Sequence, residues 1–470
     1  MADVCVIGGG PAGSIFAARM AQLGHTVTLV ERAQFPRRHL GESLSPGVLP
    51  LLETVGARDA VESAGFERVR RVLVQWEGAE QVREDPREEG LLVDRGRFDQ
   101  ILLERARALG VRVLQPARVV ARRETSEGWS IRIAAESGHI ELKADFLADA
   151  SGRSSPAQRR HTGCRTLALY AYWQGSDLPR EPRIEAGDDA WYWGVPLPDR
   201  SCNTLVFIDP AEFRATRSGS LREEFLLRIR CSSLLAGCRD AQLAGPVEAI
   251  DATPYLAEDC VSATSLRVGE AALAIDPVSS SGVQKAMQSA LAAAVVANTL
   301  LRRPESADVA MRFYRSNLED ASHRHARWAA GYYGKVADER GGKFWRDRSA
   351  GAEQETIPEP KPPLDAQTMT TAAVALSQQL EFVELPCIEG DFVTTKAGLR
   401  HPNLDGPIVY LGGQELAPLL RELRPGQTPV ELAQTWSGRV RLQSGLAIAG
   451  WLVNNELLVP EPQPHAHGAA

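Results

Sequence analysis

Residues 4–31 constrain the fold of this chain more than any other stretch. A short apolar run is followed by three glycines in GxGxxG spacing, an Ala- and Leu-rich segment, a second apolar run and an acid. This order predicts a strand, a tight turn, a helix and a second strand. Such glycines let the chain turn, approach a diphosphate and pack helix on strand, while the acid can bind ribose hydroxyls. We therefore expect a dinucleotide site formed by Gly8, Gly10, Gly13 and Glu31.

Composition narrows the class of protein. The 470 residues suffice for two or three domains, and 44% hydrophobic with 24% charged residues is ordinary for a soluble enzyme. A net charge of −7 argues against a nucleic-acid partner, because phosphate binding needs a concentrated basic face. The seven cysteines form no CxxC, which predicts reduced thiols and neither a disulfide framework nor a metal site.

No secretory signal or membrane span is predicted. The first apolar run begins almost at Met1, with no charged region and apolar core ahead of it. The longest apolar-rich stretch, residues 286–301, contains Gln, Ser, Asn and Thr, which favours a buried helix over a membrane span. We therefore expect a soluble, cytoplasmic protein with no membrane partner.

The order of the remaining segments predicts an α/β fold with an insertion. Strand and helix patterns over residues 1–166 return over 252–334, which together predict one Rossmann-like dinucleotide-binding domain. Residues 167–251 alternate aromatic and polar residues, and predict a substrate-facing mixed β-sheet domain to which residues 68–95 contribute a part. Residues 335–365 combine Gly, Pro and dense charge, and predict a mobile linker.

The tail, residues 366–470, predicts a separate small α+β domain. Residues 382–395 read as a possible pair of strands, and residues 415–423, 429–435 and 442–454 as helices. This order resembles a winged-helix module of the kind that binds leader peptides in enzymes that modify ribosomal peptides. The overall acidity of the chain lowers the alternative of DNA binding.

Further landmarks follow the glycine turn. They are GES at Gly41-Glu42-Ser43, DRxxFD around Arg95, DxSGRSS beginning at Asp149, Gly269-Glu270, and DPxxSSGV running from Asp276 through Ser281 and Gly282 to Val283. The last landmark opens a long helix, whose N–H groups could stabilise negative charge on a reduced isoalloxazine ring.

Together these motifs resemble the FAD-dependent monooxygenase and halogenase superfamily, over roughly residues 1–330. The resemblance implies that FAD is the cofactor and that NAD(P)H is the reductant. Only one GxGxxG is present, so NAD(P)H is expected to bind briefly or to act through a partner. The residues it implies for FAD are Gly8, Gly10, Pro11, Ala12, Gly13, Glu31, Arg32, Glu42, Ser43, Arg95, Asp149, Gly269, Asp276, Ser281, Gly282 and Val283. Glu270 departs from the more usual Asp at its position.

Two subclasses of this superfamily compete. Residues 191–196, WYWGVP, resemble the WxWxIP signature of flavin-dependent halogenases. Halogenases also need a lysine, and local alignment puts Glu67 in its place. Tryptophan halogenases further use a glutamate where this chain has Ser279. Because both groups differ, we expect oxygen transfer rather than halogenation.

Trp191 and Trp193 are the candidate substrate-binding residues. In a strand they share one face, and Tyr192 takes the other. Two interpretations remain open at this point: the indoles pack the core between sheet and FAD domain, or they form an aromatic wall that holds a planar substrate. The sequence identifies no catalytic acid or base.

A flavoprotein hydroxylase with a peptide-binding tail resembles the monooxygenases that oxygenate a tryptophan residue during tryptophylquinone cofactor biogenesis. That resemblance implies a C4a-hydroperoxyflavin, a polypeptide substrate (a small quinoprotein subunit) and a radical maturase as a further partner. The alternatives are a hydroxylase or halogenase of a small aromatic metabolite, a polyprenyl reductase, and a peptide chaperone with a vestigial flavin fold.

Overall fold

The computed structural model describes residues 3–84, 89–216, 219–350 and 370–461. The chain divides into two compact units, Met1–Gln354 and Glu355–Ala470. Within the described residues, no helix combines the length and the hydropathy needed to cross a membrane.

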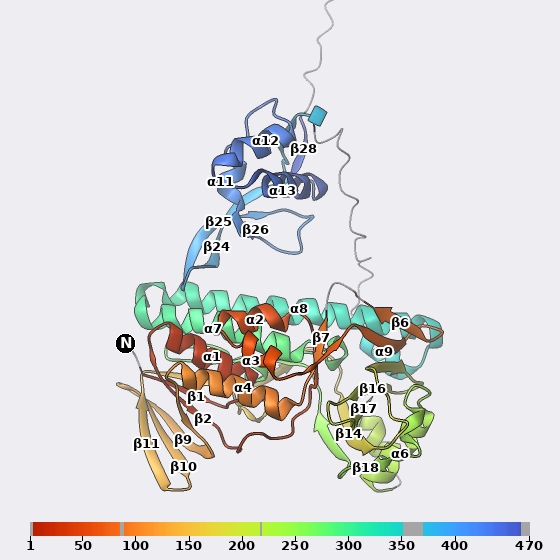
Figure 1. Cartoon of the computed structure of the whole chain (residues 1–470). Helices are drawn as coiled ribbons and strands as arrows, with labels where there is room; N and C mark the ends of the chain where they lie inside the picture. The colour runs from red at the N-terminus through yellow and green to blue at the C-terminus, as the bar shows by residue number, and fades with distance from the viewer. Residues whose placement is uncertain (1–2, 85–88, 217–218, 351–369, 462–470) are drawn as a thin grey trace, which may run out of the picture. The chain divides into compact units, whose positions relative to one another are not determined.

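A five-stranded parallel sheet forms the centre of the first unit, as the alternation of strands and helices predicted. Its order is β21-β12-β1-β2-β8, for strands Ser265–Arg267, Phe146–Asp149, Asp3–Ile7, Thr26–Val30 and Arg112–Leu114. Parallel sheets are covered on both faces. Helices α1 (Pro11–Gln22), α4 (Arg95–Ala108) and α7 (Gly282–Arg302) pack together on one face (Figure 1). The meander of β9 (Ala117–Thr125), β10 (Gly128–Ala135) and β11 (Gly138–Ala144) covers the other, with Ile131 and Ile133 packed on Cys5 and Val30.

The turn between β1 and α1 depends on two glycines. Gly8 has φ +105°, a left-handed conformation that favours glycine. Gly13 lies so close to the strand end that a Cβ there would be 1.9 Å from the Gly8 carbonyl oxygen. Pro11 fixes φ in the first turn of α1, where its missing N–H costs no helix hydrogen bond.

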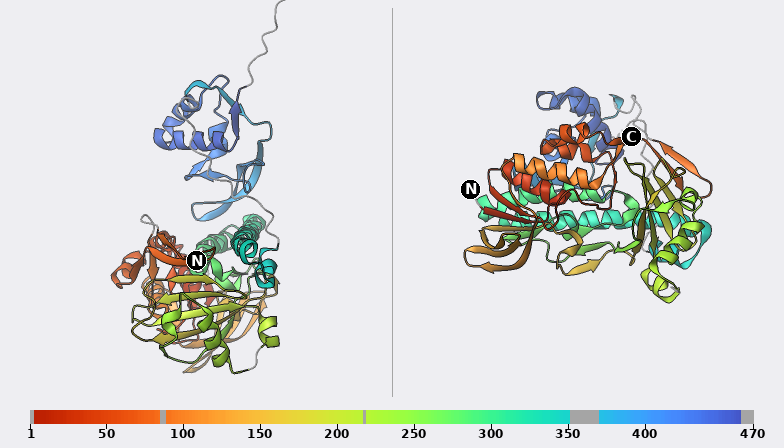
Figure 2. Two further views of the ribbon diagram at one scale, coloured as in Figure 1. Left: turned by 90° about the vertical axis from the view of Figure 1, so that its right-hand side faces the viewer. Right: turned by 60° about the horizontal axis from the view of Figure 1, so that its bottom comes forward.

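The second sheet of this unit is mixed. The left panel of Figure 2 views the first unit from the end at which this sheet lies. Its order is β18-β14-β17-β16-β15-β5-β6, with β19 also paired to β14. Only the β15–β5 pair is parallel among its described pairs. The strands are β5 (Arg71–Gln75), β6 (Gln81–Glu84), β14 (Leu167–Gln174), β15 (Arg183–Ala186), β16 (Trp191–Pro196), β17 (Cys202–Ile208), β18 (Gln242–Leu243) and β19 (Glu248–Asp251).

The two faces of the mixed sheet bury different cores. One face packs Trp76, Trp191 and Phe207 against the long helix α8 (Ala307–Arg340) and α9 (Lys343–Ser349). The other packs Tyr192 and Val206 against α6 (Leu221–Cys231). Helix α8 runs along the first unit past both sheets (Figure 1).

Shorter elements complete the first unit. Strands β3, β7 and β4 form one small sheet and β13, β20 and β22 another. The bounds are β3 (Ser43–Leu44), α2 (Val48–Thr54), α3 (Arg58–Ser63), β4 (Glu67–Val69), β7 (Gly90–Leu92), β13 (Arg159–His161), α5 (Pro210–Thr216), β20 (Tyr255–Ala257) and β22 (Leu273–Ala274).

The predicted linker over residues 335–365 is wrong for its first part. Helix α8 continues to Arg340, and α9 follows it after two glycines with positive φ. Phe344 and Trp345 are buried in the aromatic core, and the Arg348 guanidinium lies 3.7 Å from the centroid of the Phe344 ring. Dense charge and glycine suggested a linker, but two aromatic anchors make the segment part of the core. Residues 351–365 lie outside the described residues.

The second unit is a small α+β structure. Strand β23 (Val374–Leu376) pairs with β28 (Leu458–Pro460), and β24 (Glu381–Glu389) forms a hairpin with β25 (Phe392–Arg400). Its core gathers Leu416, Leu432, Trp436 and Leu452. The remaining elements are β26 (Tyr410–Leu411), β27 (Gln414–Glu415), α11 (Leu416–Leu420), α12 (Pro429–Thr435) and α13 (Leu442–Asn454).

We expect Gly13→Ala to destabilise the first unit. Its methyl group would meet backbone, which cannot move aside as a flexible side chain would. Overpacking of this kind costs about 1–3 kcal/mol. The matched control is Gly331→Ala in α8, where no described atom beyond the helix's own neighbouring backbone and the two adjacent residues lies within 4 Å of the added Cβ. The control should be neutral or stabilising by up to about 1 kcal/mol. Denaturant unfolding of both FAD-free variants measures this, and equal stabilities would contradict the packing argument.

Candidate active site

A cavity of about 910 Å³ lies between the parallel sheet and the mixed sheet of the first unit. The carboxyl ends of β1, β2 and β12 bound it on one side, and β14, β16 and β17 of the mixed sheet bound it on the other. Ligands of open parallel sheets bind at the carboxyl ends of the strands. The cavity thus joins the predicted dinucleotide site to the predicted substrate wall.

Most of the predicted site residues line this cavity. They are Gly8, Gly10, Pro11, Ala12, Glu31, Arg32, Glu42, Ser43, Arg95, Asp149, Trp191, Trp193, Asp276, Gly282 and Val283. Gly13, Gly269 and Ser281 are not among the described lining residues. Gly13 and Gly269 instead allow close packing behind the lining, because a Cβ at Gly269 would lie 2.6 Å from the Ala12 Cβ.

The glycine turn leaves open space on its cavity side. The nearest described atom to a Cβ built on Gly10 is Arg37 Nη2, at 4.0 Å. Helix α1 starts at the next residue, so its positive N-terminal end faces the same space. A side chain at position 10 would occupy the space that a diphosphate needs, whereas one at position 13 would collide with the protein itself.

Glu31 is held in place at the end of β2. Its Oε2 accepts the Gly9 N–H at 2.6 Å, and its Oε1 accepts the Ala33 N–H at 2.8 Å. The residue is 5% exposed and lines the cavity. A carboxylate oxygen has more than one acceptor position, so both oxygens can still take ribose hydroxyls.

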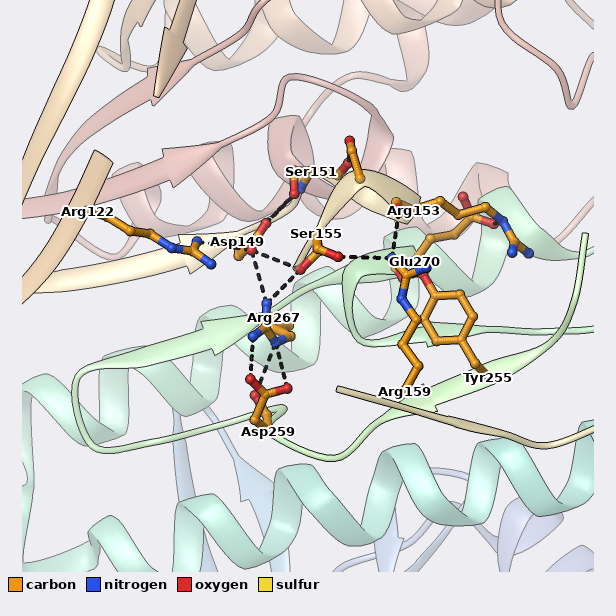
Figure 3. A network of polar contacts seen from close by, with 11 residues as sticks. Arg122, Asp149, Ser151, Arg153, Ser155, Arg159, Tyr255, Asp259, Arg267 and Glu270 are labelled. Carbon is orange, nitrogen blue, oxygen red and sulfur yellow. Dashed lines mark hydrogen bonds and ion pairs between the residues drawn. The ribbon is translucent and has the colours of Figure 1, made fainter. Parts of the chain in front are cut away.

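Asp149 is the centre of a polar network at the end of β12 (Figure 3). Its Oδ2 accepts hydrogen bonds from Arg122 at 3.0 Å, Arg267 at 3.1 Å and Ser155 at 3.0 Å. Burial raises its pKa, but the Ser151 hydrogen bonds and Arg122 outweigh this, and the net pKa is lowered. Because the carboxylate is occupied by protein donors, Asp149 shapes the cavity wall by positioning Arg122 and the strand end.

A second pair in Figure 3 joins the DxSGRSS motif to Gly269-Glu270. Arg153 Nε lies 3.4 Å from Glu270 Oε1, and the Arg153 guanidinium lies 5.4 Å from the centroid of the Tyr255 ring. Tyr255 in turn donates a hydrogen bond to the Glu270 carbonyl at 2.5 Å. The longer side chain of Glu270 therefore engages Arg153 at the cavity wall.

Glu42 connects the GES motif to the mixed sheet. Its Oε1 accepts hydrogen bonds from Tyr172 of β14 at 2.9 Å and from Asn203 of β17 at 3.0 Å. Its Oε2 accepts the Gly41 N–H at 2.9 Å. Burial raises the pKa of Glu42, although the bond from Tyr172 lowers it in part. Neither partner was predicted, since both are far away in the sequence.

Arg95 supports the same loop from α4. Its Nε donates to Asp99 at 3.0 Å, and its Nη1 donates to the Leu40 carbonyl. His39, in this loop, also lines the cavity and hydrogen-bonds the Leu40 carbonyl through Nδ1 at 3.0 Å. Desolvation, followed by the charge of Arg95, lowers the pKa of His39, although its side chain remains exposed to solvent.

The start of α7 adds a polar floor to the cavity. Asp276 Oδ1 accepts the Tyr333 hydroxyl at 2.8 Å and the Val278 N–H at 3.0 Å. Lys285, in the first turns of α7, also lines the cavity. Burial and then Arg324 lower the pKa of Lys285. Burial, followed by the charges of Lys285 and Arg324, lowers the pKa of His325 on α8 to about 4.

Lys285 was not predicted as a site residue, and Glu67 lies away from the cavity. Glu67 is exposed in the short strand β4 and is not among the described lining residues. A lysine in the first turns of a helix that begins with DPxxSSGV was the signal that could have pointed to Lys285. Glu67 occupies the position aligned with the halogenase lysine. Lys285, the only lysine among the described residues that line the cavity, lies elsewhere in the chain.

At the aromatic end of the cavity, one indole of WYWGVP packs in the core and the other lines the open space. Trp191 is 2% exposed and stacks on Phe207, with ring centroids 3.6 Å apart. Trp193 shares its face, is partly buried and lines the cavity. Tyr192 points into the opposite core. Trp191 thus belongs largely to the core, and Trp193 is the better placed of the two to contact a substrate.

Comparison with known proteins identifies the family. A model of the FAD binding domain matches residues 1–166, and one of tryptophan halogenases matches residues 84–361. The chain belongs to the tryptophan halogenase family. Tryptophan 2-halogenase of Chondromyces crocatus is 32% identical, over 75% of this chain and 71% of its own length. Flavin-dependent halogenase armH4 of Armillaria mellea is 30% identical, over 72% and 73%.

Two solved structures are similar to this chain over both of its units. QhpG is described as a peptidyl tryptophan dihydroxylase essential for tryptophylquinone cofactor biogenesis. It is 30% identical with a TM-score of 0.75, covering 97% of this chain and 99% of QhpG. The flavin-dependent halogenase CmlS has a TM-score of 0.79 at 20% identity, covering 97% and 95%. These matches confirm the resemblance to FAD-dependent monooxygenases and halogenases.

The cavity fits the FAD that this family requires. Gly10 leaves a cradle beside the start of α1, and Glu31 offers a fixed carboxylate one strand away. These are the groups that a diphosphate and a ribose need.

We expect Gly10→Val to lose FAD while the fold survives. The new side chain would enter the open cradle and not the protein interior. Absorbance of the purified protein measures FAD occupancy, and thermal unfolding of the FAD-free forms measures the fold. Gly13→Ala serves as a contrast, because it should lower stability as well. Full FAD occupancy in the Gly10 variant would overturn the assignment of the turn.

Proposed function

We propose that this family member is an FAD-dependent monooxygenase that hydroxylates a tryptophan side chain of a polypeptide, using NAD(P)H and O2. The similarity to QhpG carries this proposal, because at 30% identity it extends over 97% of the chain. The proposed substrate is a small quinoprotein subunit, with a radical maturase as a further partner, in a reducing cytoplasm. Domain roles follow: residues 1–166 and 252–334 bind FAD, and residues 167–251 face the substrate.

In this proposal the residues of the cavity bind, orient and exclude water. FAD, when bound, supplies the oxygen-activating chemistry. The glycine turn and Glu31 would hold its diphosphate and ribose, and the N–H groups at the start of α7 would stabilise negative charge that develops on its ring system. Trp193, supported by the buried Trp191–Phe207 stack, orients the substrate indole. A misplacement of about 1 Å could cost on the order of a hundredfold in rate.

Tryptophan halogenation is the second candidate. It is favoured by the family itself, and by Lys285, a lysine that lines the cavity although Glu67 occupies the aligned position. Against it, Ser279 stands where tryptophan halogenases have a glutamate, and Glu67 stands in the position aligned with their lysine. Oxygen transfer requires neither a lysine nor a halide, so we prefer it.

We expect no halogenated product from this enzyme. Purified full-length protein, FAD, NAD(P)H, a flavin reductase and saturating bromide or chloride would be mixed with free tryptophan and with tryptophan-containing peptides. Mass spectrometry should find oxygenated peptide and no halogen isotope pattern. A halogenated product that disappears in Lys285→Met, a variant of similar length without the charge, would replace the proposal by the second candidate.

The second unit, in this proposal, recognises the polypeptide. A small-molecule site of a few hundred cubic ångströms already buries its substrate, so a further unit of 116 residues calls for another role. Tethering a binding unit raises the local concentration of a peptide to roughly the millimolar range. Its compact core around Trp436 and Leu452 gives it the folded form that a binding unit needs.

Truncation after Lys361 should leave FAD binding and NAD(P)H oxidation intact but slow oxygenation at limiting polypeptide. The readout is the gain of one or two oxygen atoms on tryptophan, measured for both proteins as the polypeptide concentration varies. The loss should be largest at low polypeptide and should shrink toward saturation. Equal rates at limiting polypeptide, from a folded and yellow truncated protein, would show that the second unit is structural only.

A further inference from the structure

A small side pocket lies behind the segment that precedes α7. Its volume is about 40 Å³, which at roughly 10–15 Å³ a molecule holds about two or three waters. Most of its lining comes from the turn between β13 and β14, the segment before α7, and helices α8 and α9. Gly163 of this lining is exposed, whereas Ala329 and Tyr333 are buried. The side pocket therefore leads from the surface toward the core.

Asp276 separates the side pocket from the large cavity, because it lines both. The residue is 9% exposed, and the Tyr333 hydroxyl and the Val278 N–H donate to its Oδ1. Leu273 and Ile275 belong to both linings as well. One carboxyl group thus borders the space that fits FAD on one side and a pocket that leads to the surface on the other.

Two buried polar atoms in the lining of the side pocket have no partner among the described residues. They are Ser322 Oγ on α8 and Arg348 Nε on α9, from residues that are 2% and 6% exposed. The terminal nitrogens of Arg348 donate to the Phe344 and Arg165 carbonyls at 3.3 and 3.1 Å. Buried polar groups that lack a protein partner are satisfied by ordered water. The side pocket is therefore suited to hold water beside Asp276.

The groups that face Asp276 act on its charge in opposite directions. Burial raises the pKa of Asp276, while the Val278 N–H, the Tyr333 hydroxyl and the charge of Arg348 lower it in part. The net pKa is raised. A further negative charge nearby would raise the pKa of this carboxyl group again, because like charges disfavour its ionised form.

The other titratable groups around Asp276 keep one charge near neutral pH. Burial, with the charges of Lys285 and Arg324, lowers the pKa of His325 to about 4, and burial raises the pKa of the Cys164 thiol. Both of these pocket residues are therefore uncharged. Lys285 is a cation on the side of the large cavity. Among these described groups, Asp276 is the one whose charge an added negative charge in the cavity can change.

Reduction of a flavin by hydride adds such a charge, since the ring system gains two electrons and one proton. We propose that Asp276 takes up a second proton, by way of water in the side pocket, when the flavin in the cavity is reduced, and releases it when the flavin is oxidised again. Protonation of the carboxylate stabilises the reduced flavin in return, because the two equilibria are linked. The inference goes beyond the proposed function and depends only on FAD in the cavity, so a failure to hydroxylate tryptophan would leave it standing.

Electrons and protons balance in this step. The hydride of NAD(P)H carries two electrons and one proton to the flavin, and NAD(P)⁺ leaves. The Asp276 carboxylate takes one proton from hydronium through the pocket water and becomes the neutral acid. A monooxygenase consumes one proton besides the hydride for each O2, because one oxygen atom leaves as water. Asp276 holds one such proton for as long as the flavin stays reduced.

The pH dependence of the flavin midpoint potential in full-length, FAD-loaded protein tests the inference. Each proton taken up with two electrons shifts the potential by about 30 mV per pH unit, the value of a tenfold change for a two-electron couple. The slope of wild type should exceed that of Asp276→Asn by about 30 mV per pH unit over part of the range from about pH 6 to 9. Equal slopes across that range would overturn the inference.

Two further variants make this comparison specific. Asp251→Asn is the matched control, because Asp251 lines the same cavity but is exposed. Partial burial raises the pKa of Asp251, but hydrogen bonds from Thr253 outweigh it and the net pKa is lowered, so this variant should keep the wild-type slope. Tyr333→Phe removes a hydrogen bond that stabilises the Asp276 carboxylate, so its steep interval should move to higher pH. An unmoved interval would contradict the assignment to Asp276.

Proton uptake is counted separately with a pH indicator in weakly buffered, anaerobic solution. One equivalent of NADH and a trace of flavin reductase reduce the bound FAD, and the hydride itself removes no proton from solution. Wild type should take up as much as one proton per flavin, and Asp276→Asn none. Equal uptake with normal FAD absorbance would overturn the role of Asp276 alone, whereas protein that binds no FAD would overturn the FAD site as well.

The route through the side pocket has its own test. A high-resolution crystal structure should show water within hydrogen-bond distance of Ser322 Oγ and Arg348 Nε. A dry side pocket would overturn the route by which the proton reaches Asp276.

Discussion

The close approach of Gly13 to the Gly8 carbonyl fixes how helix α1 packs on the end of β1, and so where the start of that helix lies beside the cavity. Helix α1 can lie on the end of β1 only because residue 13 has no side chain, and its first turn then faces the cavity. Gly269 likewise lacks a side chain where it packs against Ala12, and this lets the segment before α7 lie close to α1. The absence of side chains at Gly13 and Gly269 thus allows the N-terminal ends of α1 and α7 to lie beside the same cavity.

The cavity is held together by bonds between distant segments. Glu42 joins the loop after β2 to β14 and β17, and Asp149 joins β12 to the meander and to β21. Buried carboxylates with several donors are costly to leave unpaired, so these networks fix the geometry once they form.

Local sequence signals predicted the elements whose physics is local. The turn from β1 to α1 follows from its glycines. Helix α12 was predicted with its observed ends, and in the structure Thr428 and Glu431 form a capping box at its start. Segment 335–349 was misread because its charges outnumber Phe344 and Trp345, the two rings that bury it. The partners of Glu42 depend on pairings across the fold that no local pattern encodes. Lys285 had a local signal, its place in the first turns of the helix that follows DPxxSSGV, but that signal was not used.

The source of the oxygen tests the central claim most directly, because a monooxygenase takes it from O2. The measurement is mass spectrometry of the tryptophan-containing polypeptide after reaction with full-length enzyme, FAD and NAD(P)H under heavy-isotope O2 in ordinary water. The account predicts that every oxygen added to the indole carries the heavy isotope. Addition of ordinary oxygen from water, or replacement of an indole hydrogen by a halogen, would contradict it.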